Sequence, residues 1–223
     1  MSLPAPDDTV EGWLAPEIEL ELPGLRLLTS EVRVRRVGSL TRDSPPEVEA
    51  RMRELSNRVR GARAIGIRRE PVPAAYRVFF RHIGLDPDVV RTPIEDAVLE
   101  RMLRGGFPTG GYLDDVLTIA LMDTGVPVWA LDGKGVDGAL GIRSSAEAEP
   151  LGRSAAPPQL PRGRLVVADS TVPLAVLFGE RASEHVPGPR SERLLLYAVG
   201  VQGVPGLYVE EALWSARTSL EAG

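Results

Sequence analysis

Apolar residues follow two different spacings along the chain, and the change falls near its middle. Before residue 125 they recur every three or four positions, which is typical of one face of an amphipathic helix. This spacing predicts helices over residues 46–63, 73–83, 93–104 and 113–123. After residue 125, short apolar runs separated by turn residues predict strands, and a helix closes the chain: residues 127–131, 139–143, 164–168, 173–178 and 194–201, then 206–219.

The beginning of the chain is predicted to combine a tail with extended segments. Residues 1–12 have the composition of a loose tail. Residues 17–22 alternate acidic and aliphatic side chains, and after a Pro-Gly turn residues 25–37 continue in an extended pattern. We therefore expect a tail and a first strand in residues 1–22, and a single domain in residues 23–223.

Helices in the first half and strands in the second indicate an α+β fold rather than a regular alternation of strand and helix. Turn residues at 132–133 and 136–138 predict a hairpin between the strands at 127–131 and 139–143. Residues 145–162 are rich in Ala, Pro and Ser, which predicts an exposed loop.

Two of the helices carry specific expectations. Thr92 and Glu95 have the spacing of a capping box, with a proline at the first helical position between them. The helix that follows should bury Ile94, Val98 and Met102. The last helix should bury Val209, Leu213, Trp214 and Leu220.

The composition narrows the class of protein. The 223 residues include 43% hydrophobic and 26% charged residues, as in ordinary globular proteins. No apolar run approaches the ~20 residues of a membrane helix, and the acidic N-terminus has no export signal, so we expect a cytoplasmic protein without membrane contact. The lack of cysteine excludes disulfides and thiolate chemistry. With only His82 and His185 available, we expect no metal site and no cofactor.

The charge is unevenly distributed along the chain. The formal net charge is −5, whereas a nucleic-acid-binding protein normally carries a basic surface. Residues 51–69 nevertheless hold seven arginines against a single glutamate. Candidate nucleic-acid contacts in this run are Arg51, Arg58 and Arg60. The alternative is that these arginines only form a solvated helix face. Almost all basic residues of this chain are arginine, so the run need not reflect phosphate binding.

The central segment has a recognisable order of residues. Asp115 opens an apolar helix, and ten residues later Gly125 begins a Gly-x-Pro-x-x-Ala-x-Asp run that ends at Asp132. This pattern resembles the editing domain (third and fourth B modules) of the phenylalanyl-tRNA synthetase β subunit, which also occurs as free-standing proteins. Matches in the same order extend the resemblance from about Pro23 to Trp214: Pro23-Gly24-Leu25, Tyr76-Arg77, residues 84–95, Arg143, Glu149 and Ala168-Asp169.

The resemblance implies a fold and a kind of ligand. The fold would be a three-layer α+β domain that contains a β-sandwich of unusual topology. In the synthetases this domain hydrolyses tyrosine wrongly attached to the phenylalanine tRNA. The resemblance therefore implies tRNA or aminoacyl-tRNA as a partner.

This chain departs from the family at the polar positions of that pocket. A family histidine corresponds to Trp129, an arginine to Pro108, and a glutamate that recognises the phenol to Tyr197. Asparagines flanking the helix aspartate correspond to Gly111 and Thr118. Because a site that loses its polar partners loses most of its discrimination, we do not expect the editing reaction of the synthetases.

The candidate substrate-binding residues are Arg91, Trp129, Asp132, Arg143 and Tyr197. Each has a structural alternative: Arg91 could pair with Glu95, Trp129 could lie in the core, and Asp132 could form a turn before a glycine. No catalytic residue is predicted, because no histidine is placed to activate a hydroxyl. The glycines at 133, 135 and 138 match a dinucleotide motif, but a strand rather than a helix is predicted after them.

Three functions remain open from the sequence. The first is an RNA-associated module that binds tRNA or aminoacyl-tRNA, with weak or altered aminoacyl-tRNA deacylase activity as its enzymatic form. The second is a protein that binds a small metabolite such as an amino acid, without RNA or catalysis. The third is a partner-binding scaffold with a vestigial pocket. Nothing in the sequence predicts an oligomeric state.

Overall fold

The computed structural model describes residues 9–35 and 38–222. These residues form helices together with strands in separate sheets, which confirms the α+β class. None of the helices in the described ranges is both long enough and apolar enough to cross a membrane.

The strands of the described residues form two four-stranded sheets and one short ribbon. The first sheet is antiparallel throughout, in the order β1 (Thr9–Glu11), β3 (Arg26–Arg33), β10 (Arg193–Gly200) and β4 (Val128–Asp132). The second sheet has the order β2 (Trp13–Leu14), β5 (Gly141–Ser144), β8 (Leu165–Ala168) and β9 (Pro173–Val176). The ribbon pairs β6 (Glu149–Pro150) with β7 (Gln159–Leu160).

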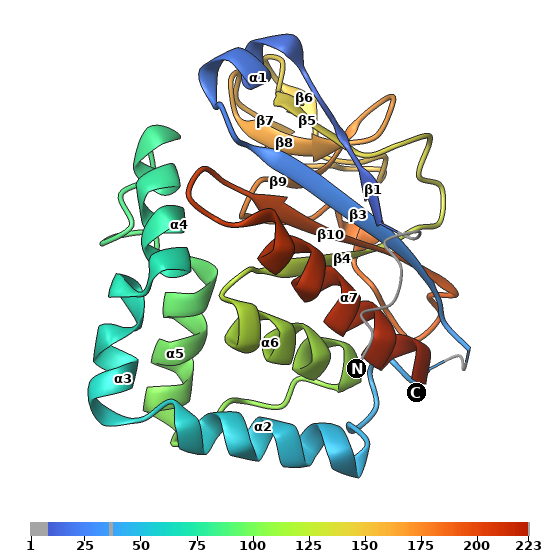
Figure 1. Cartoon of the computed structure of the whole chain (residues 1–223). Helices are drawn as coiled ribbons and strands as arrows, with labels where there is room; N and C mark the ends of the chain where they lie inside the picture. The colour runs from blue at the N-terminus through green and yellow to red at the C-terminus, as the bar shows by residue number, and fades with distance from the viewer. Residues whose placement is uncertain (1–8, 36–37, 223) are drawn as a thin grey trace.

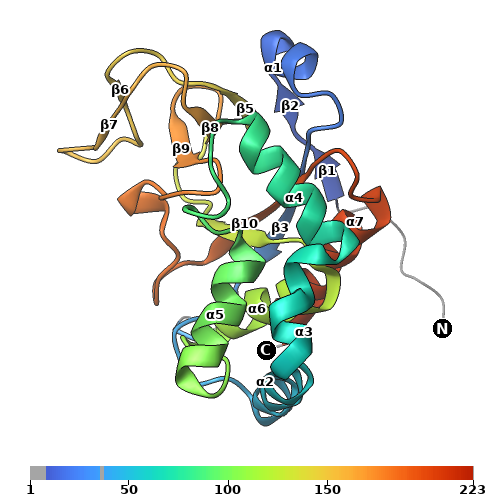
Figure 2. The same cartoon turned by 90° about the vertical axis from the view of Figure 1, so that its left-hand side faces the viewer.

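Helices cover the side of the first sheet that faces away from the second sheet (Figure 1). α7 (Gly206–Ala222) packs on β3 and β10, with α6 (Tyr112–Thr124) beside it. α2 (Pro46–Arg58) packs against α6. α4 (Pro71–His82) and α5 (Pro93–Arg104) follow one another along one side of the molecule (Figure 2). Shorter helical segments are α1 (Pro16–Glu21), α3 (Gly61–Gly66), η1 (Ile67–Arg69) and η2 (Ser183–His185).

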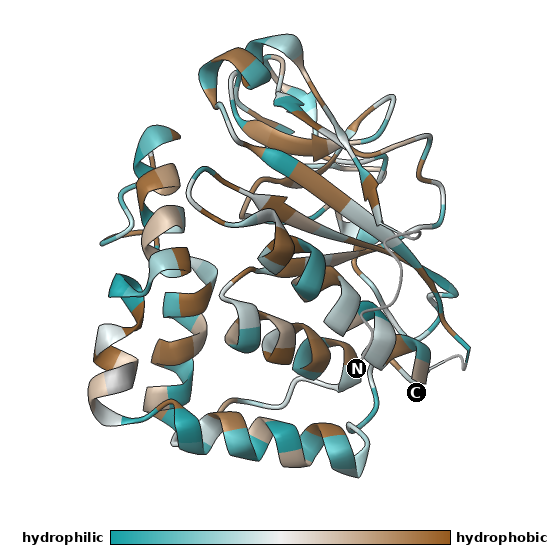
Figure 3. Ribbon diagram, viewed as in Figure 1, coloured by the Kyte–Doolittle hydropathy of each residue, from teal (hydrophilic) through white to brown (hydrophobic). Residues whose placement is uncertain are grey.

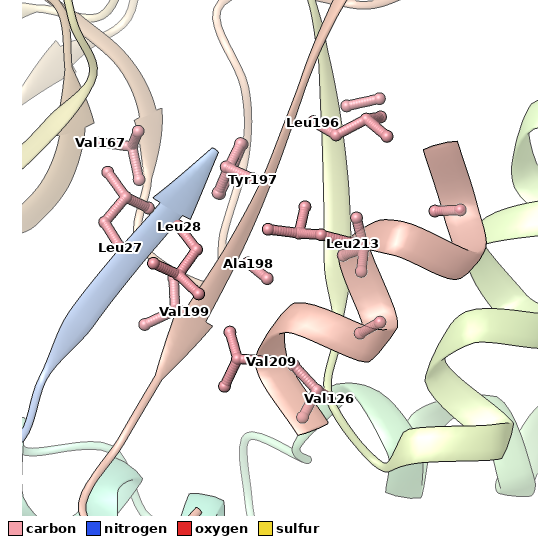
Figure 4. Packing of buried hydrophobic residues seen from close by; sticks show 14 of the residues in the cluster. Leu27, Leu28, Val126, Val167, Leu196, Tyr197, Ala198, Val199, Val209 and Leu213 are labelled. Carbon is pink, nitrogen blue, oxygen red and sulfur yellow. The ribbon is translucent and has the colours of Figure 1, made fainter. Parts of the chain in front are cut away.

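The core depends on the alternation of side chains along β10. Leu196 and Ala198 point towards α7, whereas Tyr197 and Val199 lie on the opposite face, towards Val167 of the second sheet (Figure 4). Both faces of β10 are therefore buried, and the first sheet is the middle layer between helices and second sheet. Hydrophobic residues accordingly dominate β10 and α6, while α2 is more hydrophilic (Figure 3).

The helix predictions are confirmed for the long elements, with small shifts at their ends. The predicted helix at 46–63 ends earlier, at Arg58, and α3 begins at Gly61 after a break. The capping box of α5 is present, with Thr92 and Glu95 in their expected roles.

The predicted strand at 17–22 is wrong, because this segment forms the helix α1. Pro16 occupies the first helical position, and two acidic residues stand in the first turn, where the helix dipole favours them. Only Ile18 of this segment is buried, while Leu20 is 85% exposed. The alternation of acidic and aliphatic residues therefore does not correspond to a half-buried strand.

The predicted hairpin between β4 and β5 is also wrong. β4 pairs with β10 in the first sheet, and β5 pairs with β2 and β8 in the second. Residues 133–140 thus cross from one sheet to the other. Asp132 and the glycines after it end β4 and turn the chain, as predicted, but turn residues do not determine which strand becomes the neighbour.

Three smaller expectations are corrected. Part of the predicted tail forms β1, while residues 1–8 lie outside the described residues. The predicted loop at 145–162 contains the β6–β7 ribbon. Trp214 and Met102, predicted to be buried, are 43% and 49% exposed. On α5 the side chain of Arg101 is buried in place of Met102, and it donates two hydrogen bonds to the backbone oxygen of Ser56.

Replacing Gly125 by alanine is expected to lower the free energy of unfolding by about 2 kcal/mol. Gly125 ends α6 in the left-handed region (φ 78°), and an added Cβ would lie 3.0 Å from Cγ1 of Val72. Gly105 ends α5 with nearly the same backbone (φ 76°) and nothing within 4 Å of an added Cβ, so it is the matched control. Gly105→Ala should cost about 1 kcal/mol, from the backbone alone. Equal losses in urea denaturation would contradict the close approach to α4.

Candidate functional site

An aromatic cluster joins β4 and β10 to α4. The rings of Trp129 and Tyr197 are stacked, with centroids 5.4 Å apart and an interplanar angle of 15°. They come together because these two residues are direct partners in the β4–β10 ladder. Phe178, which follows β9, places its ring edge-on to Trp129 at 5.2 Å. On its other sides Phe178 contacts three rings of α4: Tyr76, Phe79 and Phe80.

Two neighbouring cavities lie beside this cluster, between α5, α6 and the outer edge of β4. One, of about 390 Å³, is lined by Arg91, Pro93, Asp96, Ala97, Glu100, Phe107, Pro108, Thr118 and Phe178. The other, of about 330 Å³, is lined by Pro93, Asp114, Leu117, Thr118, Leu121, Pro127, Val128 and Trp129. They share Pro93 and Thr118, so we treat them as one groove with an α5 end and a β4 end.

The groove is lined by four charged side chains, and of these Glu100 is paired with Arg104, whereas Arg91, Asp96 and Asp114 have no side-chain partner among the described residues. Arg91 is exposed at the α5 end and has no ion pair among the described residues. Asp114, at the β4 end, likewise has no hydrogen bond or ion pair to its carboxylate within the described part of the chain. Asp114 is exposed, but partial desolvation of its carboxylate by its neighbours raises its pKa; the charge of Arg181 opposes this rise, and Asp115 adds to it. Arg181 is fixed by a 2.9 Å hydrogen bond to the backbone oxygen of Ala130.

Tyr197 contributes a ring rather than a titrating group. It is 2% exposed, and burial raises the pKa of its phenol well above the ordinary value. The phenol therefore stays protonated at neutral pH and cannot act as a base. Its position in the middle layer makes it the support on which Trp129 stacks.

The start of α5 is held by ion pairs that do not involve Arg91. Arg77 on α4 donates to Glu95 at 2.5 Å and to Asp88 at 2.6 Å. Glu95 in turn accepts from the backbone N–H of Thr92 as part of the capping box. The sequence left open whether Arg91 pairs with Glu95. In the structure Arg77 takes this place, so Arg91 stays available to a ligand.

The structure brings together three of the five predicted substrate-binding residues. Arg91, Trp129 and Tyr197 belong to the groove or its supporting wall. Asp132 and Arg143 do not line it. Asp132 accepts from Oγ of Ser191 at 2.5 Å and from the backbone N–H of Lys134, the turn-forming alternative. Arg143 forms a two-pronged ion pair with Glu149, at 2.5 and 2.9 Å.

The predicted nucleic-acid residues are engaged within the protein. Arg51 and Arg58 both donate to Asp123 of α6, at 2.8 and 2.6 Å. Arg60 is exposed and hydrogen-bonds the side chain of Asn57. These contacts join α2 to α6, so Arg51 and Arg58 would reach a phosphate only by sharing or leaving Asp123.

Sequence reasoning missed Asp114, Phe178 and Arg181. It considered Asp115 instead, which is 1% exposed and accepts from Oγ of Ser44 at 2.7 Å, so its role is structural. The two adjacent aspartates in the first turn of α6 were the one feature of the sequence that could have pointed to Asp114. Phe178 falls at the end of the predicted strand at 173–178 and Arg181 in the loop after it, and only the folded chain places them beside β4.

The arrangement suits binding better than covalent chemistry. Within the described residues no group of three or more His, Asp or Glu side chains could hold a metal ion. His185 is 2% exposed, and its Nδ1 lies 2.9 Å from the backbone oxygen of Asp132. The described lining of the groove holds no hydroxyl–histidine pair that could serve as nucleophile and base. What it offers is an aromatic wall with Arg91 among carboxylates at the α5 end and the carboxylate of Asp114 at the β4 end.

No protein-family model matches this chain, and a search of curated proteins finds no match either.

Proposed function

We propose that this protein is an RNA-associated binding module, related to the editing domain of the phenylalanyl-tRNA synthetase β subunit, whose groove binds the aminoacyl end of a tRNA. The observation that carries the proposal is the pair of adjoining cavities, treated as one groove, with Arg91 at one end and Trp129 and Phe178 along the wall. A terminal nucleotide presents a phosphate and a base, which arginine and aromatic rings recognise. A cytoplasmic location is part of this proposal.

Any hydrolysis at this site would be weak or altered aminoacyl-tRNA deacylation. The described groove supplies no general base next to a nucleophile, so a water positioned by the hydroxyls of the substrate would have to attack the ester. Trp129 would then act by orienting the substrate, because its ring carries no proton to transfer.

A second function is favoured by the charges. With a net charge of −5 and with Arg51 and Arg58 paired to Asp123, the protein has a weaker basic surface than its arginine run suggests. Binding of a free amino acid, without RNA, needs only the groove and no phosphate contacts.

The test compares aminoacyl-tRNA, uncharged tRNA and free amino acids as ligands, at several salt concentrations, and follows amino-acid release over time. We expect aminoacyl-tRNA to bind with an affinity that falls as salt rises, because phosphate contacts release counterions. Trp129→Ala and Arg91→Ala should each weaken binding by about tenfold, since stacking and charge-assisted contacts are lost.

Arg162→Ala is the matched control, because Arg162 is exposed and does not line the groove. If it weakened binding as much as Arg91→Ala, the contact would be general charge attraction rather than the groove. Saturable binding of a free amino acid, with no salt-dependent binding of any tRNA, would replace the first function by the second.

A further inference from the structure

The β4 end of the groove carries a carboxylate that forms no hydrogen bond or ion pair with the described residues. Asp114 carries the only charged side chain among the residues that line this 330 Å³ cavity. Its carboxylate has no partner among the described residues, and the hydroxyl of Thr118 is directed to the backbone oxygen of Asp114 at 2.8 Å instead. Because Asp114 is exposed to solvent, water can solvate this carboxylate, which leaves it free to pair with a cation.

The outer edge of β4 adds a second acceptor to the same cavity. Gly133 donates its N–H to the oxygen of Arg193, which fixes the phase of the β4–β10 ladder. Since hydrogen-bonded pairs alternate along an antiparallel ladder, the N–H and C=O groups of Val128, Ala130 and Asp132 point away from β10.

Two of these outward carbonyls are already used. Arg181 donates to Ala130, and Nδ1 of His185 lies 2.9 Å from the oxygen of Asp132. The oxygen of Val128 accepts no hydrogen bond within the described residues, and Val128 lines the cavity. The cavity therefore presents a carboxylate, a free carbonyl and the indole of Trp129, all of which attract positive charge.

We propose that this end of the groove binds a primary ammonium group, with Asp114 as its counter-ion and the Val128 carbonyl and Trp129 ring as further contacts. Ammonium donates up to three hydrogen bonds, and an aromatic face attracts a cation. The raised pKa of Asp114 is consistent with this, because an incoming cation would stabilise its ionised form. The inference deepens the proposed function, on which it rests: the α-amino group of an amino acid or an aminoacyl ester is such an ammonium.

The alternatives within the groove are weaker. At the α5 end, Arg91 stands near Asp96 and Glu100, so the charge there is mixed and selects no single ligand charge. Arg181 lies near Asp114 but is held by Ala130. Among the residues that line the β4 end, the carboxylate of Asp114 is the one charged group, and the guanidinium of Arg181 lies near it outside this lining.

The test uses L-phenylalanine methyl ester, which has an ammonium group and no carboxylate, and its N-acetyl derivative, which has neither charge. Titration calorimetry or ligand-observed NMR measures both affinities on the full chain. We expect the ester to bind at least about tenfold more tightly than the N-acetyl ester, since a charge-assisted contact is lost on acetylation.

Asp114→Asn should weaken binding of the ester by about tenfold and abolish the difference between the two probes. Asp137→Asn is the control, because it removes an exposed carboxylate that lines neither cavity and should leave the difference intact. A thermal unfolding curve for each variant shows that the fold is retained. Equal affinities for the two probes, or an unchanged ester affinity in Asp114→Asn, would overturn the inference.

The outcomes separate this inference from the proposed function. If aminoacyl-tRNA binds but Asp114→Asn and acetylation of its amino group have no effect, the ammonium site is wrong and the RNA-binding module stands. If the ester and free L-phenylalanine bind through Asp114 but no tRNA does, the ammonium site stands and the source of the ligand is a free amino acid.

Discussion

Replacing Asp169 by alanine is expected to lower the free energy of unfolding by about 3 kcal/mol, because it leaves buried hydrogen-bond donors and the charge of Arg153 without their acceptor. The Asp169 side chain is 0% exposed. It accepts hydrogen bonds from the backbone N–H groups of Asp137, Thr171 and Val172 at 2.8–3.0 Å, and from Arg153 at 2.7 Å. Chemical denaturation at neutral pH measures the loss.

The same contacts predict how this contribution depends on pH. Burial alone would raise the pKa of Asp169, but the three backbone N–H groups and Arg153 outweigh it and hold the pKa well below its ordinary value. A carboxyl group whose pKa is lowered by folding stabilises the native state above its unfolded pKa of about 3.9. As the pH falls below that value towards the folded pKa, the stabilisation is lost. The difference between wild type and Asp169→Ala should therefore shrink in acid.

Asp137→Ala is the matched control for Asp169→Ala. Asp137 is exposed and contributes only its backbone N–H to Asp169, which alanine retains. We expect a change within about 0.5 kcal/mol. A loss at Asp169 below 1 kcal/mol, or one that does not diminish in acid, would contradict the view that this carboxylate holds the crossing between the sheets.

Asp169 also explains why the β4–β5 hairpin prediction failed. Residues 133–140 contain turn signals that are real, but their path is set by contacts with the β8–β9 turn. Ser170 donates its N–H to the oxygen of Asp137, while Asp169 accepts the N–H of Asp137. These two bonds join segments more than thirty residues apart, and no local pattern encodes them.

Local signals predicted the elements better than their partners. The start of α5 was predictable because Thr92 and Glu95 satisfy each other within one turn. The exposure of Trp214 was not predictable, because the helical period selects a face of the helix but not how much of that face the neighbouring layer covers.

The candidate site was predictable only in part, for a similar reason. Trp129 and Tyr197 were singled out by a resemblance to a family, and the ladder of β4 with β10 does make them neighbours. Asp132 and Arg143 were singled out on the same grounds, yet each is held by a partner outside the groove: Ser191 in the loop before β10, and Glu149 in β6. Whether a polar residue faces a ligand or a neighbouring loop depends on tertiary contacts that spacing does not contain.

Phe178→Ala is expected to destabilise the protein by about 3 kcal/mol and to remove one wall of the groove. Phe178 contacts four rings at centroid distances of 5.0–6.0 Å, so its loss leaves a cavity where α4 meets β4 and β10. Urea denaturation measures stability. Fluorescence of Trp129, in a background where Trp13 and Trp214 are replaced by phenylalanine, reports the loss of its neighbour.

Phe178→Gly separates the ring from the backbone. Phe178 has φ 57°, a left-handed conformation that side chains with a Cβ adopt at a cost. Glycine removes the ring as alanine does but relieves this cost, so Phe178→Gly should be more stable than Phe178→Ala by about 1 kcal/mol. The reverse order would mean that the backbone there relaxes once the ring is gone. Both variants should bind the aminoacyl ligand equally weakly, because the wall that orients Trp129 is missing in each.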